Sequence, residues 1–205
     1  MKKSVLFVLL LAAALVPFTA GAQGKMSLSV GGDLLLPMGT FGDAVGMGFG
    51  GSVRGQYDIT PMFSAGLTAG YYTWSGKDRT FGTQTYDGPS LSGIPIRAFG
   101  KYYFMPEGEK IRAYGIAELG VFIASPGDVT IPNPLAALPG QPATITVSGE
   151  SSTEFNYAPG VGAEFIVGGG NTKLDVSARY DAIATEGETS GSIGFRVGVN
   201  FGLGN

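Results

Sequence analysis

The fold of this chain is indicated most clearly by the segment Gly194-Phe195-Arg196-Val197-Gly198-Val199-Asn200-Phe201-Gly202-Leu203. Apolar side chains occupy every second position from Phe195 to Leu203, and glycine or a polar side chain occupies each position between them. A period of two is that of a β-strand, because successive side chains of a strand point to opposite faces of the sheet. This segment therefore has one apolar face and one face that carries Arg196 and Asn200 among glycines.

The same alternation recurs along the chain and is punctuated by glycine- and proline-rich breaks. Eight segments show it: 26–36, 47–58, 62–74, 92–104, 111–125, 153–167, 173–184 and 191–203. Short turns and longer loops alternate between them, the loops being 37–46, 75–91, 126–152 and 185–190. This layout predicts an all-β fold, an eight-stranded antiparallel up-and-down transmembrane β-barrel. No helical periodicity follows residue 22, so no helix is expected within the barrel.

The composition of the polar face bears on whether that face meets water or fills a lumen. A soluble barrel points its apolar face inward, whereas a membrane barrel points it outward. Charged residues make up only 14% of the chain, and the polar face alternates small residues with a few charges. A crowded lumen needs small residues for space and needs an opposite partner for each buried charge. We therefore expect the ionic side chains to converge inside the barrel.

The expected lumen cluster has a structural role and contains both signs of charge. Its members are Asp33, Arg54, Arg97, Lys101, Arg112, Glu118, Glu164, Asp175, Arg179 and Arg196. Further inward charges are expected at Asp58, Glu154, Lys173 and Asp181, so that the interior could neutralise itself.

The cost of reversing this orientation is large. An arginine turned toward lipid at the bilayer midplane costs about 2–4 kcal/mol. Four arginines fall near the middle of their segments: Arg54, Arg97, Arg179 and Arg196. Turning all four outward would cost about 8–16 kcal/mol, which is as large as the roughly 5–15 kcal/mol that stabilises an ordinary domain. A one-residue slip reverses every side chain of a strand, so the register is strongly specified.

The amino terminus has the pattern of a cleaved signal peptide. Lys2 and Lys3 precede an apolar stretch, and Ala20-Gly21-Ala22 provides small residues for cleavage. We expect residues 1–22 to be the signal peptide and residues 23–205 to form the barrel. The apolar stretch is shorter than the roughly 20 residues that span a bilayer as a helix.

Composition leaves few routes to catalysis or cofactor binding. The chain has no His and no Cys, which are the commonest general base and the commonest thiolate ligand. Its net charge of -3 argues against nucleic-acid binding. We expect no catalytic, cofactor-binding or metal site, no cofactor and no enzymatic activity. The carboxylates that approach one another in neighbouring strands, such as Glu164 and Asp175, are interpreted as salt-bridge partners.

Aromatic residues cluster near the expected strand ends, as in the two interfacial girdles of membrane barrels. The short-turn end has Tyr57, Phe63, Tyr102, Phe104, Phe165 and Phe201. The long-loop end has Phe49, Tyr71, Trp74, Phe155 and Tyr180. Pro95 and Pro159 fall inside expected strands, where a bulge or a strand portion beyond the membrane would accommodate the missing N–H.

With these strands, the Ala20-Gly21-Ala22 signal ending and the 194–203 segment, the chain resembles the small eight-stranded outer-membrane barrels. These include the OmpA transmembrane domain and OmpX-like proteins, and the broad outer membrane protein beta-barrel domain family often labelled porin-family. The resemblance implies a location in the outer membrane of a Gram-negative-type cell envelope. It also implies contact with lipid and lipopolysaccharide, handling by the barrel-assembly machinery, and a monomer.

The loops are where a specific function is expected. In loop 126–152, the arms 128–131 and 143–147 could extend a hairpin above the membrane, and the apolar tip 135–138 could contact a surface partner. The loops are richer in acids than in bases, which would suit divalent-cation bridges to lipopolysaccharide. The favoured hypothesis is a structural or surface-interaction role. The alternatives are a narrow channel for ions or small solutes and a soluble secreted ligand carrier.

Overall fold

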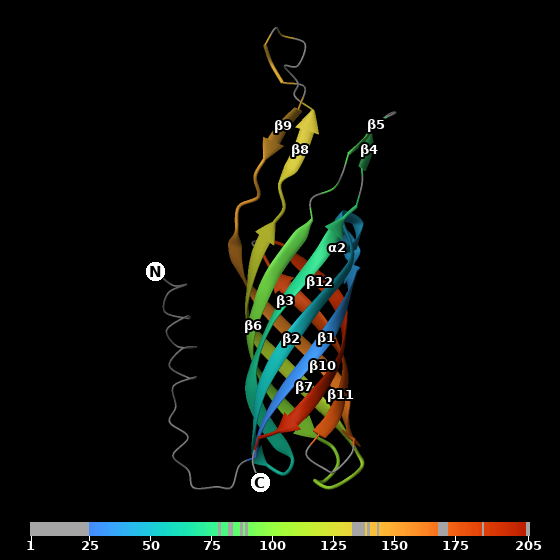
Figure 1. Ribbon diagram of the computed structural model, residues 1–205, viewed down its shortest axis with the longest axis vertical. Coiled ribbons are helices and arrows are strands. Elements are labelled where there is room, and N and C mark those ends of the chain that lie inside the picture. Colours follow the sequence, from blue (N-terminus) through green and yellow to red (C-terminus); the bar gives the residue numbers. More distant parts are fainter. Residues whose placement is uncertain are drawn as a thin grey trace, which may run out of the picture.

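The computed structural model is a closed barrel of eight antiparallel strands (Figure 1). The strands are β1 (Met26–Met38), β2 (Val45–Thr60), β3 (Phe63–Gly76), β6 (Leu91–Tyr103), β7 (Ile111–Pro126), β10 (Ser152–Val167), β11 (Thr172–Ala184) and β12 (Thr189–Gly202). The structure describes residues 25–77, 79–81, 84–86, 88, 90–132, 138, 140–142, 144–167, 172–185 and 187–203. The expected signal peptide, residues 1–22, lies outside the described residues.

Each barrel strand pairs with its neighbours in the chain, and β1 pairs with β12 to close the sheet. The observed strands agree with the expected segments to within two residues at each end, because alternation and turn residues mark both limits. Both described ends of the barrel chain lie at the short-turn end, and the longer loops lie at the other (Figure 1). The prediction of an up-and-down eight-stranded barrel is confirmed.

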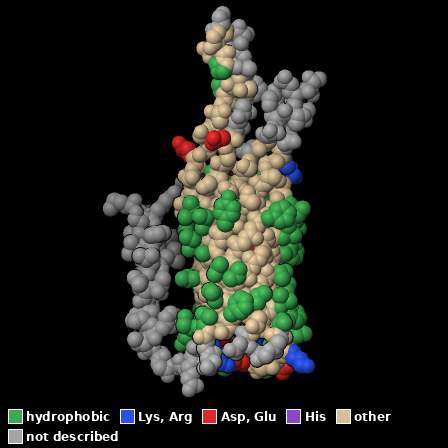
Figure 2. Space-filling view, viewed as in Figure 1, with side chains coloured by type: hydrophobic (Ala, Val, Ile, Leu, Met, Phe, Trp, Pro, Cys, Tyr) green, Lys and Arg blue, Asp and Glu red, His purple; other side chains and the backbone are tan. Residues whose placement is uncertain are grey.

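Apolar side chains face outward and polar side chains face inward. In β12, Phe195 and Val197 are 44% and 55% exposed, whereas Arg196 between them is fully buried. Figure 2 shows hydrophobic side chains around the barrel wall, with charged side chains above and below them on the face in view. This is the orientation of a membrane barrel. A soluble ligand carrier needs the reverse, so the structure excludes that alternative.

Short elements lie at the long-loop end of the barrel. They are helix α2 (Gly39–Ala44) and the strands β4 (Arg79–Phe81), β5 (Gln84–Tyr86), β8 (Val129–Pro132) and β9 (Thr144–Val147). Helix α2 lies within the expected loop 37–46, and its six residues are too few to show a helical period in the sequence. The hairpin expected from the arms of loop 126–152 is confirmed as β8 and β9. None of the helices among the described residues could cross a membrane, being neither long nor apolar enough.

Pro95 and Pro159, which were expected inside strands, each interrupt strand pairing on one side only. Pro95 pairs with Phe122 of β7, while the pairing of β6 with β3 skips from Ile96 to Gly93. Pro159 pairs with Ala117 of β7, while the pairing of β10 with β11 skips from Tyr157 to Gly160. A proline has no N–H to donate, so each interruption lies where that donor is missing.

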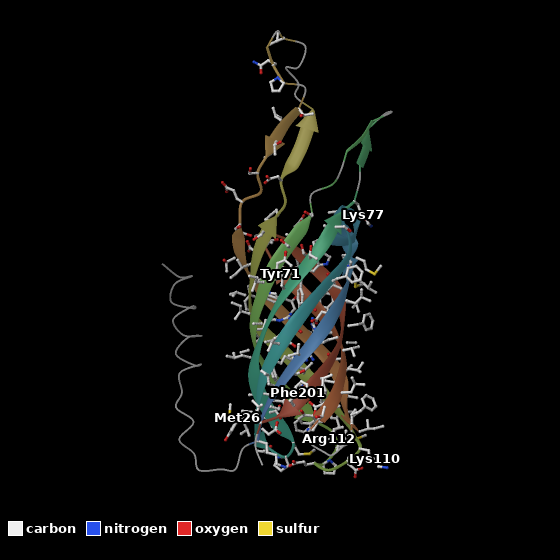
Figure 3. The ribbon with its side chains drawn as sticks, in the orientation of Figure 1. Met26, Tyr71, Lys77, Lys110, Arg112 and Phe201 are labelled. Carbon is white, nitrogen blue, oxygen red and sulfur yellow. The ribbon has the colours of Figure 1, made fainter. Side chains whose placement is uncertain are left out.

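The expected aromatic girdles are present with one correction. At the long-loop end Phe49, Tyr71, Phe155 and Tyr180 are exposed on the outer wall, and at the other end so are Phe63, Tyr102, Phe104 and Phe201, whereas Tyr57 and Phe165 are half-buried. Figure 3 shows Tyr71 and Phe201 near the two ends of the wall. Trp74 was expected in the upper girdle, but its side chain is only 2% exposed and lies inside the barrel. Trp74 has the same strand parity as Tyr72, and both point inward.

The outward register can be tested with paired arginine substitutions. Val197→Arg near the middle of β12 should destabilise the barrel by about 2–4 kcal/mol, because it places a charge in the hydrocarbon core. Val167→Arg at the short-turn end of β10, where the parent side chain is equally exposed, should cost about 0–1 kcal/mol. Urea unfolding in lipid vesicles measures both. Equal costs at the two positions would contradict the membrane orientation.

Candidate functional site

The lumen holds a continuous network of buried ion pairs. Its residues come from seven strands, β1, β2, β6, β7, β10, β11 and β12, and occupy the inward positions that alternation assigns to them. The basic members are Arg54, Arg97, Lys101, Lys173, Arg179 and Arg196, and the acidic members are Asp33, Glu118, Glu164, Asp175 and Asp181. Because each charge has an opposite neighbour, the cost of burying it is offset by ion pairing.

One half of the network is centred on Arg97 and Arg179. Arg179 pairs with Asp33 at 2.7 Å and with Asp181 at 2.6 Å. Arg97 also pairs with Asp181 and reaches Glu118 at 2.9 Å. The carboxylate of Asp181 therefore joins the two guanidinium groups.

The other half is centred on Asp175. Its carboxylate lies 2.9 Å from Lys101, 3.4 Å from Arg196 and 3.8 Å from Arg54. Arg54 lies 2.5 Å from Glu118, which links this half to Arg97. The two halves thus form one chain of alternating charge.

Several pairs cross the lumen and join walls that are not neighbours in the sheet. Arg54 on β2 reaches Glu118 on β7, although β3 and β6 lie between these strands. Arg97 on β6 reaches Asp181 on β11, with β7 and β10 between them. These ion pairs connect strands that are not joined by backbone hydrogen bonds. The network therefore stabilises the cross-sectional shape of the barrel.

Buried tyrosines and a serine supply additional hydrogen bonds. The Tyr72 hydroxyl accepts from Arg97 at 2.9 Å and from Arg179 at 2.8 Å. Tyr114 donates to Asp175 at 3.0 Å, and Tyr103 donates to Glu164 at 2.8 Å. Hydrogen bonds to charged groups are stronger than neutral ones, so these hydroxyls stabilise the buried charges.

Ser52 connects two charged residues of the network through hydrogen bonds. It donates to Asp33 at 2.6 Å and accepts from Arg196 at 2.9 Å. The lumen cluster expected from the sequence omits Tyr72 and Tyr103. Their strand parity, which they share with Arg97 and Lys101 on β6 and with Trp74 on β3, could have identified them.

Glycines on the lumen face leave room for the large side chains. A Cβ on Gly198 would lie 2.6 Å from Nη1 of Arg196, and one on Gly31 would lie 2.8 Å from its Cζ. A Cβ on Gly48 would lie 2.4 Å from Nε1 of Trp74. Any other residue at these positions would displace its partner, which explains why the polar face combines glycines with bulky ionic groups.

The structure places every residue of the expected lumen cluster at a buried position. All of them belong to the network except Arg112, which lies at the short-turn end of the barrel. Lys173 and Asp181, expected as further inward charges, are also network members. Asp58 instead accepts hydrogen bonds from Gln56 and Ser64.

The long-loop end of the lumen is filled by apolar side chains. Trp74 packs edge-on against Tyr72, Phe122 and Phe41, with ring centroids 5.7–6.1 Å apart. Other members of this apolar plug are Leu35, Val45, Ala124 and Ile183. Phe41 belongs to α2, so the short helix lies over this mouth of the barrel. A hydrogen bond from Lys77 to the Gly42 carbonyl holds the helix there.

Polar contacts span the short-turn end. Lys25, just before β1, pairs with Glu107 in the β6–β7 turn at 2.5 Å, across the barrel from it. Their hydrogen bond lowers the pKa of Glu107 and raises the pKa of Lys25. Arg112 stacks over the Tyr103 ring at 3.8 Å and donates to the Pro61 carbonyl at 2.5 Å. Figure 3 shows Arg112 and Lys110 at this end.

The chemistry open to this arrangement is structural. The network carboxylates are each held by cations or hydroxyls, so they are poorly placed to act as a general acid or base on a substrate. Among the described residues, no group of three or more metal-ligating side chains comes together.

The comparisons with known proteins agree that this chain is similar to outer-membrane β-barrel proteins. The family model described as "Outer membrane protein beta-barrel domain" matches residues 5–201. Neisserial surface protein A is 18% identical, with a TM-score of 0.58 over 88% of this chain and 99% of that one. OprG from Pseudomonas aeruginosa is 12% identical, with a TM-score of 0.57 over 89% and 97% of the two chains.

The crystal structure of Ail, the attachment invasion locus protein of Yersinia pestis, is also similar. It is 16% identical, with a TM-score of 0.50 over 89% of this chain and 100% of that one. No curated protein is significantly similar in sequence. At these identities the solved structures share the fold.

The network can be tested at Asp175. Asp175→Asn should destabilise the barrel by about 3–5 kcal/mol, because it removes the charge that Lys101, Arg196 and Arg54 share. Ser177→Ala on the same face of β11 should change stability by less than about 0.5 kcal/mol, since the buried Ser177 hydroxyl makes no hydrogen bond among the described residues. Urea unfolding in vesicles distinguishes the two. A similar loss for both would show that the network is not a stabilising unit.

Proposed function

This chain belongs to the outer membrane protein beta-barrel domain family, and from that premise we propose that it is a monomeric surface barrel whose loops contact a partner outside the cell. It resides in the outer membrane, where its outward apolar wall contacts lipid. The filled lumen serves as a rigid support, and the loops at the long-loop end carry the specific role.

The observation that carries this proposal is a lumen filled along its length by side chains. The apolar plug occupies one end, the ion-pair network occupies the middle, and the contacts of Lys25 and Arg112 span the other end. Eight strands leave an interior just wide enough for side chains. These features favour a support for surface loops over the alternative of a narrow channel.

We also propose that the protein is not an enzyme. The chain has no His, and its buried carboxylates are committed to ion pairs. The similar Ail structure is named for attachment and invasion, which is a property of that protein. A surface-contact role for this chain rests on its own loops.

Biogenesis and lipid contacts complete the proposal. Residues 1–22 would direct export and be removed, and residues 23–205 would be folded into the membrane by the barrel-assembly machinery. Lipopolysaccharide would surround the upper girdle. Acidic loop residues such as Asp43 and Asp128 would bind its phosphates through divalent cations.

Planar-bilayer recording tests the filled lumen. The purified barrel should show no stable openings in a membrane where a reconstituted porin conducts, because the side chains of the plug and the network occupy the lumen. Stable unitary openings would assign the protein to the channel class instead.

Deletion of residues 133–142 tests the loop contact. Cells that produce the protein should adhere to a panel of immobilised matrix and serum proteins more than non-producing cells do, and the deletion should abolish the difference. Heat-modifiable gel mobility of the deletion variant controls for the intact barrel. Unchanged adherence would show that residues 133–142 do not make the contact, and would contradict a contact through this loop.

A further inference from the structure

The half of the lumen network that is centred on Asp175, called the Asp175 half below, holds more bases than acids. Its bases are Arg54, Lys101, Lys173 and Arg196. Its acids are Glu164 and Asp175, together with Glu118, which it shares with Arg97 of the other half. Across the network of the described residues, six bases therefore face five acids, and the unmatched positive charge lies in the Asp175 half.

Arg196 is the base of this half with the weakest acidic partner. Its carboxylate contact among the described residues is Asp175, whose Oδ1 lies 3.4 Å from Nη1. Its shorter hydrogen bonds, both of 2.9 Å, are donated to the hydroxyls of Ser29 and Ser52. A neutral hydroxyl accepts a hydrogen bond but does not neutralise a guanidinium. The positive charge of Arg196 is therefore the least compensated in the Asp175 half.

Arg54 has donors that the network does not use. Its Nη2 donates to Glu118, whereas its Nε and Nη1 are buried and have no hydrogen-bond partner among the described residues. Nη1 lies 3.8 Å from the same Asp175 oxygen that Arg196 approaches, so the two guanidinium groups converge. Buried polar groups of native proteins nearly always have a partner, and the free donors of Arg54 therefore indicate a ligand.

The strand register brings the amide of Asn200 to the same place. Ser29 on β1 is paired with Arg54 on one side and with Asn200 on the other, and all three side chains are buried on the lumen face. The Arg196 guanidinium lies over Gly198, two residues before Asn200, because a Cβ there would be 2.6 Å from its Nη1. Among the described residues, the Asn200 side chain makes no hydrogen bond. Its N–H groups are further unused donors beside the two guanidinium groups.

We propose that this part of the lumen binds a small monovalent anion of the chloride class, held by the guanidinium groups of Arg54 and Arg196 and the amide of Asn200. Arginine and the asparagine amide nitrogen only donate, and an anion only accepts, so the donors and the ligand are complementary. A water molecule would satisfy donors but would leave the surplus charge unpaired. A single negative charge matches the one base in excess, whereas a dianion would add a further charge beside Asp175.

The site is reached from the short-turn end of the barrel. Lys173, which is paired with Asn200 across β11 and β12, has a side chain that is 24% exposed. Phe201, the residue after Asn200, lies near this end of the wall (Figure 3). The apolar plug fills the opposite end of the lumen, so an anion enters and leaves by the same mouth. This inference goes beyond the proposed surface role and does not depend on it.

Urea unfolding of the full-length barrel in lipid vesicles tests the binding, with chloride replaced by gluconate at constant ionic strength. A ligand at one site of the folded state lowers the unfolding equilibrium constant about tenfold for each tenfold rise in its concentration above the dissociation constant. Chloride and bromide should both give this response. An unfolding constant that does not change with chloride would show that water alone occupies the donors, and a response to sulfate alone would assign a dianion. Either result overturns the proposal.

Asn200→Asp provides the missing negative charge covalently. Without chloride, this variant should be as stable as the parent barrel is in saturating chloride, and its stability should no longer depend on chloride. Asn156→Asp introduces the same carboxylate at an equally buried lumen residue of β10, and should keep the chloride response of the parent. A response that persists in Asn200→Asp, or one that is lost equally in both variants, would contradict the assigned site.

Bromide locates the anion directly. Crystals of the parent barrel grown in bromide should give an anomalous-scattering peak between Arg54 and Arg196, and crystals of Asn200→Asp should give none there. Bromide found elsewhere and absent from this position would be an adventitious ion only, and the proposal would be wrong.

Discussion

The constraint on which this structure depends is that a charge must never face lipid. Alternation along each strand directs every apolar side chain of the wall outward, and it therefore directs the ionic side chains into a narrow lumen. Burying a charge without a partner costs free energy, so each ionic side chain in the lumen also needs an opposite charge beside it. The network around Asp175 and Asp181 provides these opposite charges, and it determines which side chains fill the barrel.

Filling the lumen has a consequence for function. A barrel whose interior is occupied by ion pairs and an apolar plug has little space for a solute, and its outer wall contacts lipid. Specific recognition is then confined to the surface beyond the membrane. The hairpin formed by β8 and β9 rises beyond the barrel and is part of that surface.

The alternation of residue types within each strand accounts for most of the fold, because the two faces of a barrel strand contact different environments. In β12 the residues from Phe195 to Phe201 alternate between lipid and lumen, so strand limits and facing could be inferred without any partner strand. Helix α2 and the inward position of Trp74 were not inferred correctly. The helix is short, and Trp74 was assigned by its closeness to a strand end instead of by its parity with Tyr72.

The architecture, the outward apolar face and the set of charges that point inward could all be predicted from the sequence, because they follow from a period of two and from composition. The sequence could not determine which charges meet. Arg97 and Asp181 lie 84 positions apart on strands that do not pair, and only closure of the barrel brings them together. Tertiary structure also decided that Arg112 lies outside the network and that Phe41 closes one mouth. Such contacts depend on the curvature and register of the whole sheet, which no single strand encodes.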